Sequence, residues 1–153
     1  MNPPLSPAVR IRHAWGEADL AQIHAFLSRS YWAEGMPLDL LRRAMQGSMN
    51  FLLVDDSAPA SEQLCGYARV ITDRATYAYL CDVFVLPACR GRGWGRQLIA
   101  AVMQHPELQG LRRMQLVTRD AHGLYAPFGF TALAHPERAM EIARPGLYLP
   151  PQD

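Results

Sequence analysis

The feature that most constrains this chain is a glycine-rich turn between an apolar segment (80–86) and an amphipathic segment (93–104). Its glycines alternate along the chain: Gly91, Gly93 and Gly95. The first turn of a helix leaves backbone N–H groups unpaired and carries a partial positive charge, and glycines let those groups approach an anion closely. Three arginines add charge at the same place: Arg90, Arg92 and Arg96. The pattern predicts a phosphate-binding turn at the start of a helix.

Two common phosphate-binding motifs do not fit this turn. A dinucleotide fingerprint requires GxGxxG, and Arg96 stands where the third glycine belongs. A P-loop requires a lysine, and all 15 basic residues of this chain are arginine. The same absence excludes mechanisms that use a lysine Schiff base or a lysine general base.

Composition sets the class of molecule. The 153 residues are 50% hydrophobic and 19% charged, which is typical of one globular domain. The net charge of +1 predicts no general attraction to nucleic acid or to a membrane surface. Three cysteines without a CxxC pair indicate neither a disulfide framework nor a metal site. No signal peptide and no apolar run of ~20 residues is visible, so a cytoplasmic protein is expected.

Prolines near both ends frame one domain over residues 9–146, with a loose N-terminal tail (1–8) and a C-terminal tail (147–153). Hydrophobic periodicity predicts helices at 17–28, 37–47, 93–104 and 121–127. It predicts strands at 9–13, 49–54, 63–72, 76–86, 113–118, 130–134 and 138–143. This order indicates an α/β (α+β) fold, with helices on the faces of a mixed sheet.

Three segments together resemble the GNAT superfamily of N-acetyltransferases. The run Arg90-x-x-Gly93-x-Gly95 resembles the loop that binds the acyl-CoA pyrophosphate, and segment 82–87 resembles the strand that leads into it. Segment 125–130, Tyr-Ala-Pro-Phe-Gly-Phe, resembles the later Tyr-x-x-x-Gly-Phe signature. The resemblance implies a mostly antiparallel sheet of about seven strands, whose fourth and fifth strands splay apart around acetyl-CoA.

The resemblance also implies how the cofactor is held. The backbone of strand four pairs with the pantetheine arm, and the amides of the turn hold the pyrophosphate. Two residues depart from the family pattern: Trp94 replaces a smaller aliphatic residue, and Thr118 replaces an asparagine that contacts the cofactor. The expected cofactor-binding residues are Phe84, Val85, Leu86, Arg90, Gly91, Arg92, Gly93, Trp94, Gly95, Arg96 and Thr118.

The implied reaction is direct attack of a primary amine on the thioester of acetyl-CoA. Tyr125 matches the general-acid position, and a phenol with a pKa near 10 keeps its proton at neutral pH. Asp82 matches an acidic position on strand four and is the candidate base; alternatively, it is a structural carboxylate that holds Arg69. His122 lies one helical turn before Tyr125, where it acts as a second base or merely packs. Cys89 is expected to have a structural role and not to act as a nucleophile.

The acceptor is expected beside the loop at 30–34, where Tyr31 and Trp32 would bind a cationic or amphipathic amine. Trp32 could instead anchor the core, and Arg69 would favour an acceptor with a carboxylate. The expected partner is a small-molecule or peptide amine, without nucleic acid or membrane. Because members of the family often dimerise, a homodimer is also considered.

A second function remains open on the sequence alone. The same turn would serve a non-catalytic module that binds or senses acyl-CoA. The presence of both Asp82 and Tyr125 favours the enzyme.

Overall fold

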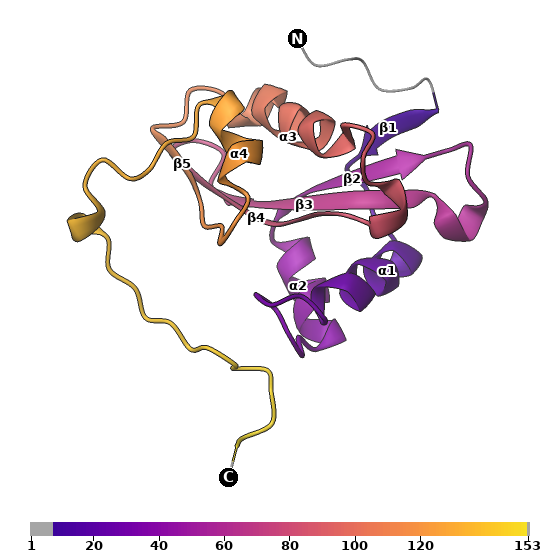
Figure 1. Cartoon of the computed structure of the whole chain (residues 1–153), viewed down its shortest axis with the longest axis horizontal. Helices are drawn as coiled ribbons and strands as arrows, with labels where there is room; N and C mark the ends of the chain where they lie inside the picture. Colours follow the sequence, from indigo (N-terminus) through magenta and orange to yellow (C-terminus); the bar gives the residue numbers. More distant parts are fainter. Residues whose placement is uncertain (1–7, 153) are drawn as a thin grey trace.

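A five-stranded mixed sheet with spatial order β1-β2-β3-β4-β5 forms the centre of the molecule (Figure 1). The computed structural model describes residues 8–152. All neighbouring strands are antiparallel except β4 and β5, which run parallel. The strands are β1 (Val9–Arg12), β2 (Met49–Asp55), β3 (Leu64–Thr72), β4 (Tyr77–Val85) and β5 (Arg113–Leu116).

Helices cover both faces of the sheet, as the sequence predicts. Figure 1 shows α1 (Glu17–Leu27) and α2 (Leu38–Gln46) on one face, with α3 (Trp94–Gln104) and α4 (His122–Tyr125) on the other. Short 3₁₀ turns lie at Ala60–Glu62, Pro87–Cys89, Pro106–Leu108, Ala126–Phe128 and Pro136–Arg138. The predicted α/β arrangement is therefore confirmed.

Two hydrophobic cores lie on opposite faces of the sheet. Because successive side chains of a strand point to opposite sides, the continuous apolar run of β2 feeds both cores. Phe51 and Leu53 pack with Leu98 and Ile99 of α3, whereas Leu52 and Val54 pack in the core of α1 and α2. Each core holds one pair of helices against the sheet. The candidate site lies at β4, between the two helix layers.

The strands predicted at 130–134 and 138–143 are wrong. Neither segment pairs with another strand in residues 8–152, so the sheet has five strands there and not about seven. Phe130 packs its ring against Tyr125, but every residue from 131 to 147 is exposed. An alternating sequence becomes a strand only when a neighbour satisfies its backbone groups, and neither segment pairs with the edge of β5, which it passes.

The parallel strands β4 and β5 separate halfway along their length. Their pairing runs from Tyr77–Arg113 to Leu80–Leu116, and β4 then continues to Val85 paired with β3 but not with β5. Beyond Leu116 the chain turns away toward α4. This divergence opens a wedge beside residues 81–85 of β4, and the candidate site is built around it.

Candidate active site

The half of β4 that β5 leaves uncovered contains a β-bulge centred on Asp82. The β3–β4 register passes from Tyr67–Phe84 to Arg69–Cys81, so Asp82 and Val83 together oppose Ala68. Asp82 has a φ of 52°, a conformation that side-chain-bearing residues seldom adopt. A bulge leaves backbone groups outside the regular ladder and re-aims the side chains beside it.

The Asp82 side chain is 7% exposed, and both of its carboxylate oxygens accept hydrogen bonds. The Arg69 Nε donates to one oxygen at 2.8 Å, and the Trp32 indole N–H donates to the other at 2.9 Å. Arg69 also donates to the Ser48 hydroxyl at 3.0 Å. A buried carboxylate requires such partners, and these contacts connect β3, β4 and the loop after α1 through a single side chain.

One cavity, of about 370 Å³, lies on the side of that loop. Tyr31 and Trp32 form one wall, and Asp82 with neighbouring β4 residues forms another. Thr118 and Arg119, which follow β5, close the cavity, and the Arg119 guanidinium lies 3.8 Å from the centre of the Tyr31 ring. This aromatic and charged cavity is called the acceptor-side cavity below.

A second cavity, of about 390 Å³, lies between the end of β4, the glycine-rich turn and α4. It is called the turn-side cavity. Gly91 and Gly93 line it with φ values of 81° and 76°, and a Cβ built on either residue would meet no other atom within 4 Å. Gly93 also caps α3, an eleven-residue helix. Left-handed glycines before a helix N-terminus present bare amides to open space, which fits a phosphate group.

The arginines of the turn are exposed and lie differently from one another. Arg90 lines the turn-side cavity and donates from Nε to the Val85 carbonyl at 2.9 Å. Arg92 lies over the Trp94 ring at 4.9 Å, and Arg96 is exposed on α3. Neither Arg92 nor Arg96 lines the cavity itself, so they contribute charge at its rim.

Tyr125 lies where the two cavities meet. It lines both of them, together with Val83 and Ala121. Burial, with a smaller contribution from nearby Tyr31, raises the pKa of Tyr125 to about 12. Within residues 8–152 its hydroxyl makes no hydrogen bond, so its proton is available to a ligand between the cavities.

The structure brings most of the predicted site residues together. Phe84, Val85 and Trp94 line the turn-side cavity along with the glycines and Arg90, whereas Tyr31, Trp32, Asp82 and Thr118 line the acceptor-side cavity. Phe84 also stacks on Phe26 at 4.0 Å, and Thr118 accepts a hydrogen bond from the Ala121 amide at 3.0 Å. Leu86 and Arg69 line neither cavity, and His122 is an exposed residue outside both.

Sequence reasoning did not find the contacts of Trp32 with Asp82 or of Tyr31 with Arg119. Their partners lie 50 and 88 positions away along the chain, and no local pattern joins them. In the sequence, the adjacent aromatic residues at 31–32 indicate that this loop contributes to a binding site, but they do not indicate which residues it contacts.

Comparisons with known proteins agree with this geometry. Residues 17–130 match the family model described as the acetyltransferase (GNAT) family. A Gibberella zeae protein assigned as an acetyltransferase is 34% identical over 121 residues, which is 67% of each chain. A Xanthomonas campestris crystal structure, assigned to the same family, shares 46% identity with a TM-score of 0.85 and covers 94% of this chain and 99% of its own.

A more distant structure shares the fold. An acetyltransferase-type protein of Clostridium acetobutylicum, solved with acetyl-CoA, has a TM-score of 0.62 and 15% identity, covering 88% of this chain and 96% of its own. The likeness to that structure shows that the two chains share a fold. On the family match and the closer relatives, the chain belongs to the GNAT acetyltransferase family.

Two features are absent from residues 8–152. No helix there is long and apolar enough to cross a bilayer. No group of three or more His, Cys, Asp or Glu side chains is placed to hold a metal ion.

Proposed function

We propose that this protein transfers an acetyl group from acetyl-CoA to a primary amine, by direct attack of the amine on the thioester. The observation that carries the proposal is the position of Tyr125, a protonated phenol on the boundary between the turn-side and acceptor-side cavities. A donor at that boundary can reach both a cofactor on one side and an amine on the other.

The turn-side cavity suits the diphosphate end of acetyl-CoA. Gly91, Gly93 and the first turn of α3 would hold the diphosphate, with Arg90 adding charge. The half of β4 that has no β5 beside it, Phe84 and Val85 in particular, would pair through its open side with the pantetheine amides, as with an added strand. The acetyl-CoA bound to the Clostridium acetobutylicum relative supports this choice of cofactor. Acetyl-CoA itself supplies the activated acyl thioester.

Tyr125 is proposed as the general acid. When the amine attacks the carbonyl carbon, the C–S bond breaks and the thiolate leaves with the electron pair. Tyr125 donates its proton to that sulfur and stabilises the departing charge. The backbone at the Asp82 bulge, which lies beside Tyr125, is the candidate for polarising the carbonyl oxygen.

Asp82 is proposed to act on the acceptor amine. Both of its oxygens already accept one hydrogen bond each, but a carboxylate can accept more, and Asp82 lines the acceptor-side cavity. Its bond to the Trp32 indole also positions a wall of that cavity. The carboxylate therefore has a positioning role beside the proposed role as base or as an attractor of the ammonium group.

The acceptor must be neutral to attack. At pH 7, deprotonating an alkyl amine of pKa near 10.4 costs roughly 4–5 kcal/mol, whereas an α-amine of pKa near 8 costs roughly 1 kcal/mol. For alkyl amines, kcat/KM should rise with pH well above 8, while for α-amines it should level off near pH 8. This contrast separates the two acceptor classes even before the physiological acceptor is identified.

The test is release of free CoA thiol from acetyl-CoA across a panel of alkyl amines, amino acids and peptide N-termini. Amine-dependent release above the rate of hydrolysis, with the acetylated product identified by mass spectrometry, is the expected result. Tight binding of acetyl-CoA without turnover on any amine would instead support the alternative, a non-catalytic acyl-CoA-binding module. Acetyl-CoA incubated with the protein but without an amine gives the background release, and Tyr125→Phe should lower the amine-dependent rate.

A further inference from the structure

One wall of the acceptor-side cavity carries a negative charge at one end and a positive charge at the other. The Arg119 guanidinium lies over the Tyr31 ring, 3.8 Å from the ring centre. The Tyr31 ring meets the Trp32 ring edge-on, with 5.1 Å between their centres, and the Trp32 indole donates to Asp82 at 2.9 Å. These contacts join a carboxylate to a guanidinium through two aromatic rings, and all four residues line the same cavity.

The guanidinium of Arg119 is held by its face, which leaves its edge free. Stacking on an aromatic ring uses the flat face of a guanidinium, whereas its N–H groups point outward in the same plane. Within residues 8–152, Arg119 forms an ion pair with Asp120 at 4.0 Å, a distance too long for a hydrogen bond. The Arg119 side chain is 64% exposed, so an anion in the cavity can reach its N–H groups. Two parallel hydrogen bonds to a carboxylate or a phosphate suit this geometry.

Arg69, from which the sequence predicts a preference for acceptors with a carboxylate, is not available for that task. Its side chain is 12% exposed, and it donates hydrogen bonds to Asp82 and to the Ser48 hydroxyl. It lines neither the acceptor-side cavity nor the turn-side cavity. Among the described residues that line the acceptor-side cavity, the basic side chain is that of Arg119. An anionic group on the acceptor would therefore meet Arg119 and not Arg69.

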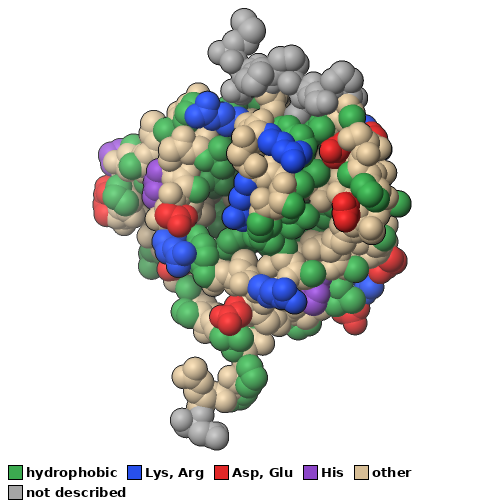
Figure 2. Space-filling view, turned by 45° about the vertical axis from the view of Figure 1, so that its right-hand side comes forward, with side chains coloured by type: hydrophobic (Ala, Val, Ile, Leu, Met, Phe, Trp, Pro, Cys, Tyr) green, Lys and Arg blue, Asp and Glu red, His purple; other side chains and the backbone are tan. Residues whose placement is uncertain are grey.

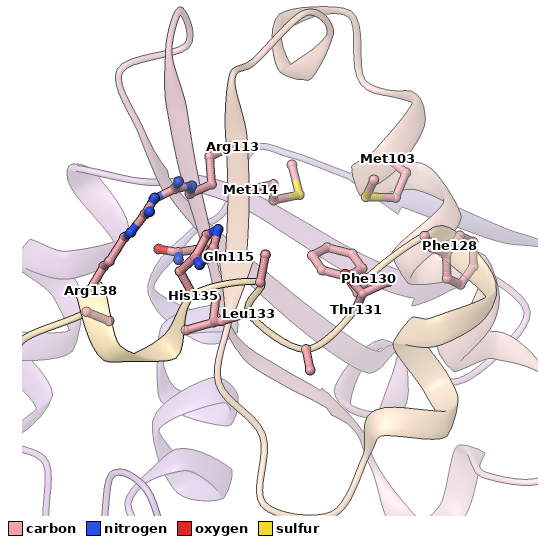
Figure 3. A pocket seen from close by; sticks show the side chains of 14 residues that line it. Met103, Arg113, Met114, Gln115, Phe128, Phe130, Thr131, Leu133, His135 and Arg138 are labelled. Carbon is pink, nitrogen blue, oxygen red and sulfur yellow. The ribbon is translucent and has the colours of Figure 1, made fainter.

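Another cavity, of about 450 Å³, provides a comparison. It lies beside β5 and shares no lining residue with the acceptor-side cavity. Arg113 and Arg138 extend toward each other across it in Figure 3, but no acidic side chain of residues 8–152 lines it. This cavity has no carboxylate to attract an ammonium group, and Tyr125 does not line it. Its arginines are therefore suitable controls for the loss of a positive charge outside the site.

We propose that the acceptor carries an anionic group, a carboxylate or a phosphate, separated by a short carbon chain from the amine that is acetylated. This inference rests on the acetyl transfer proposed above. The amine lies beside Asp82 and Tyr125. The carbon chain packs on the rings of Tyr31 and Trp32, and the anionic group bonds to the N–H groups of Arg119. Arg119 is thus a specificity-determining residue, and it neither donates nor removes a proton in the reaction.

Binding of matched amines in the presence of excess CoA tests this inference without turnover. The chains of γ-aminobutyrate and n-butylamine have the same length, but only γ-aminobutyrate ends in a carboxylate; aminopropylphosphonate ends in a phosphonate. By NMR titration at low salt, the tighter-binding anionic amine should bind roughly fivefold more tightly than n-butylamine, as expected for a partly exposed ion pair. Added salt should reduce the difference. Which anionic amine binds more tightly distinguishes a carboxylate from a phosphate, and equal binding of all three amines overturns the proposal.

Two variants assign the preference to one residue. Arg119→Gln should remove the preference for the anionic amines and leave the affinity for n-butylamine nearly unchanged. Arg138→Gln removes the same charge from the cavity of Figure 3 and should keep the wild-type preference. If Arg119→Gln weakens binding of n-butylamine as much as binding of γ-aminobutyrate, Arg119 acts only by holding Tyr31 in place, and the proposal fails.

Thiol release from acetyl-CoA with the same amines keeps this inference separate from the proposed function. Turnover of n-butylamine and γ-aminobutyrate with equal kcat/KM would overturn the anionic preference and leave acetyl transfer intact. Tighter binding of the anionic amines without turnover of any amine would support Arg119 as the anion-binding residue and overturn the proposed acetyl transfer.

Discussion

The Tyr125 hydroxyl is the group on which the proposed chemistry depends most directly. Tyr125→Phe should lower kcat by on the order of 100-fold, the lower end of what general acid catalysis contributes. The acetyl-CoA Kd should barely change, because the ring that packs on Phe130 is retained. Steady-state kinetics and calorimetric titration measure the two quantities. An equal loss in both would mean that the hydroxyl has a structural role.

Tyr125 also defines what a pH profile should show. Because burial raises its pKa to about 12, the phenol stays protonated through the ordinary working range. Loss of its proton cannot explain a fall in rate below about pH 11. In Tyr125→Phe, any alkaline limb seen below that pH should therefore persist.

Asp82 should matter for stability as well as for turnover. Asp82→Asn leaves Arg69 buried without its counter-charge, which should lower the free energy of unfolding by roughly 3 kcal/mol. The matched change Asp56→Asn removes an exposed ion pair with Arg10 and should leave the urea midpoint almost unchanged.

Kinetics separates the two roles of Asp82. Loss of a base should change the pH dependence of kcat/KM for an alkyl amine, whereas loss of a positioning contact alone should raise KM at every pH. In the stability measurement, an Asp82→Asn variant as stable as wild type would contradict the stabilising role given to the buried Asp82–Arg69 ion pair.

At the level of elements, the N-terminus of α3 should decide cofactor affinity. Gly93→Asp forces a side chain into a left-handed backbone conformation and puts negative charge where the diphosphate is proposed to lie. Acetyl-CoA binding should fall below detection by calorimetry.

Gly110→Asp supplies a matched control for that variant. Gly110 has a similar φ of 72° and similarly open surroundings, but it lies in the turn before β5. It should lose comparable stability and keep its affinity for acetyl-CoA. Equal affinity in the two variants would remove the glycine-rich turn from the cofactor site.

The elements show where sequence periodicity succeeds and where it fails. The helix expected at 93–104 appears as Trp94–Gln104, because its apolar spacing and glycine start are local signals. The segment at 138–143 has an equally regular pattern but forms no strand in the described chain. Strand formation depends on a partner that the segment itself does not contain.

The candidate site was predictable to a similar extent. Tyr125 and the glycine turn belong to short motifs, so their positions followed from the sequence. The closure of the acceptor-side cavity by Arg119, and the bond from Trp32 to Asp82, depend on how distant loops meet and could not be foreseen.

At the level of the whole molecule, the close contact between Gly35 and Tyr148 fixes the path of the exposed segment 139–147. Gly35→Ala would place a Cβ 2.8 Å from the Tyr148 carbonyl oxygen, at a φ of 79° that alanine resists. The chain around Tyr148 should then detach from the loop after α1 and lengthen the tail that already projects at the bottom of Figure 2. Chymotrypsin should cut after Tyr148 several-fold faster than in the wild type.

Gly110→Ala has comparable backbone strain and no steric conflict, so it isolates the effect of the clash at Gly35. It should show wild-type cleavage after Tyr148. Equal cleavage rates in Gly35→Ala and Gly110→Ala would mean that Tyr148 is not held by this contact.

The shared boundary of the two cavities sets a limit on the acyl donor. Among the residues that the structure describes, only Val83, Ala121 and Tyr125 border both cavities. With acetyl-CoA bound as proposed, a two-carbon acyl group would end at this junction and leave the acceptor-side cavity to the incoming amine. A longer acyl chain, such as butyryl, would extend into the acceptor-side cavity and compete with the amine. The junction would therefore select for donors with a short acyl group.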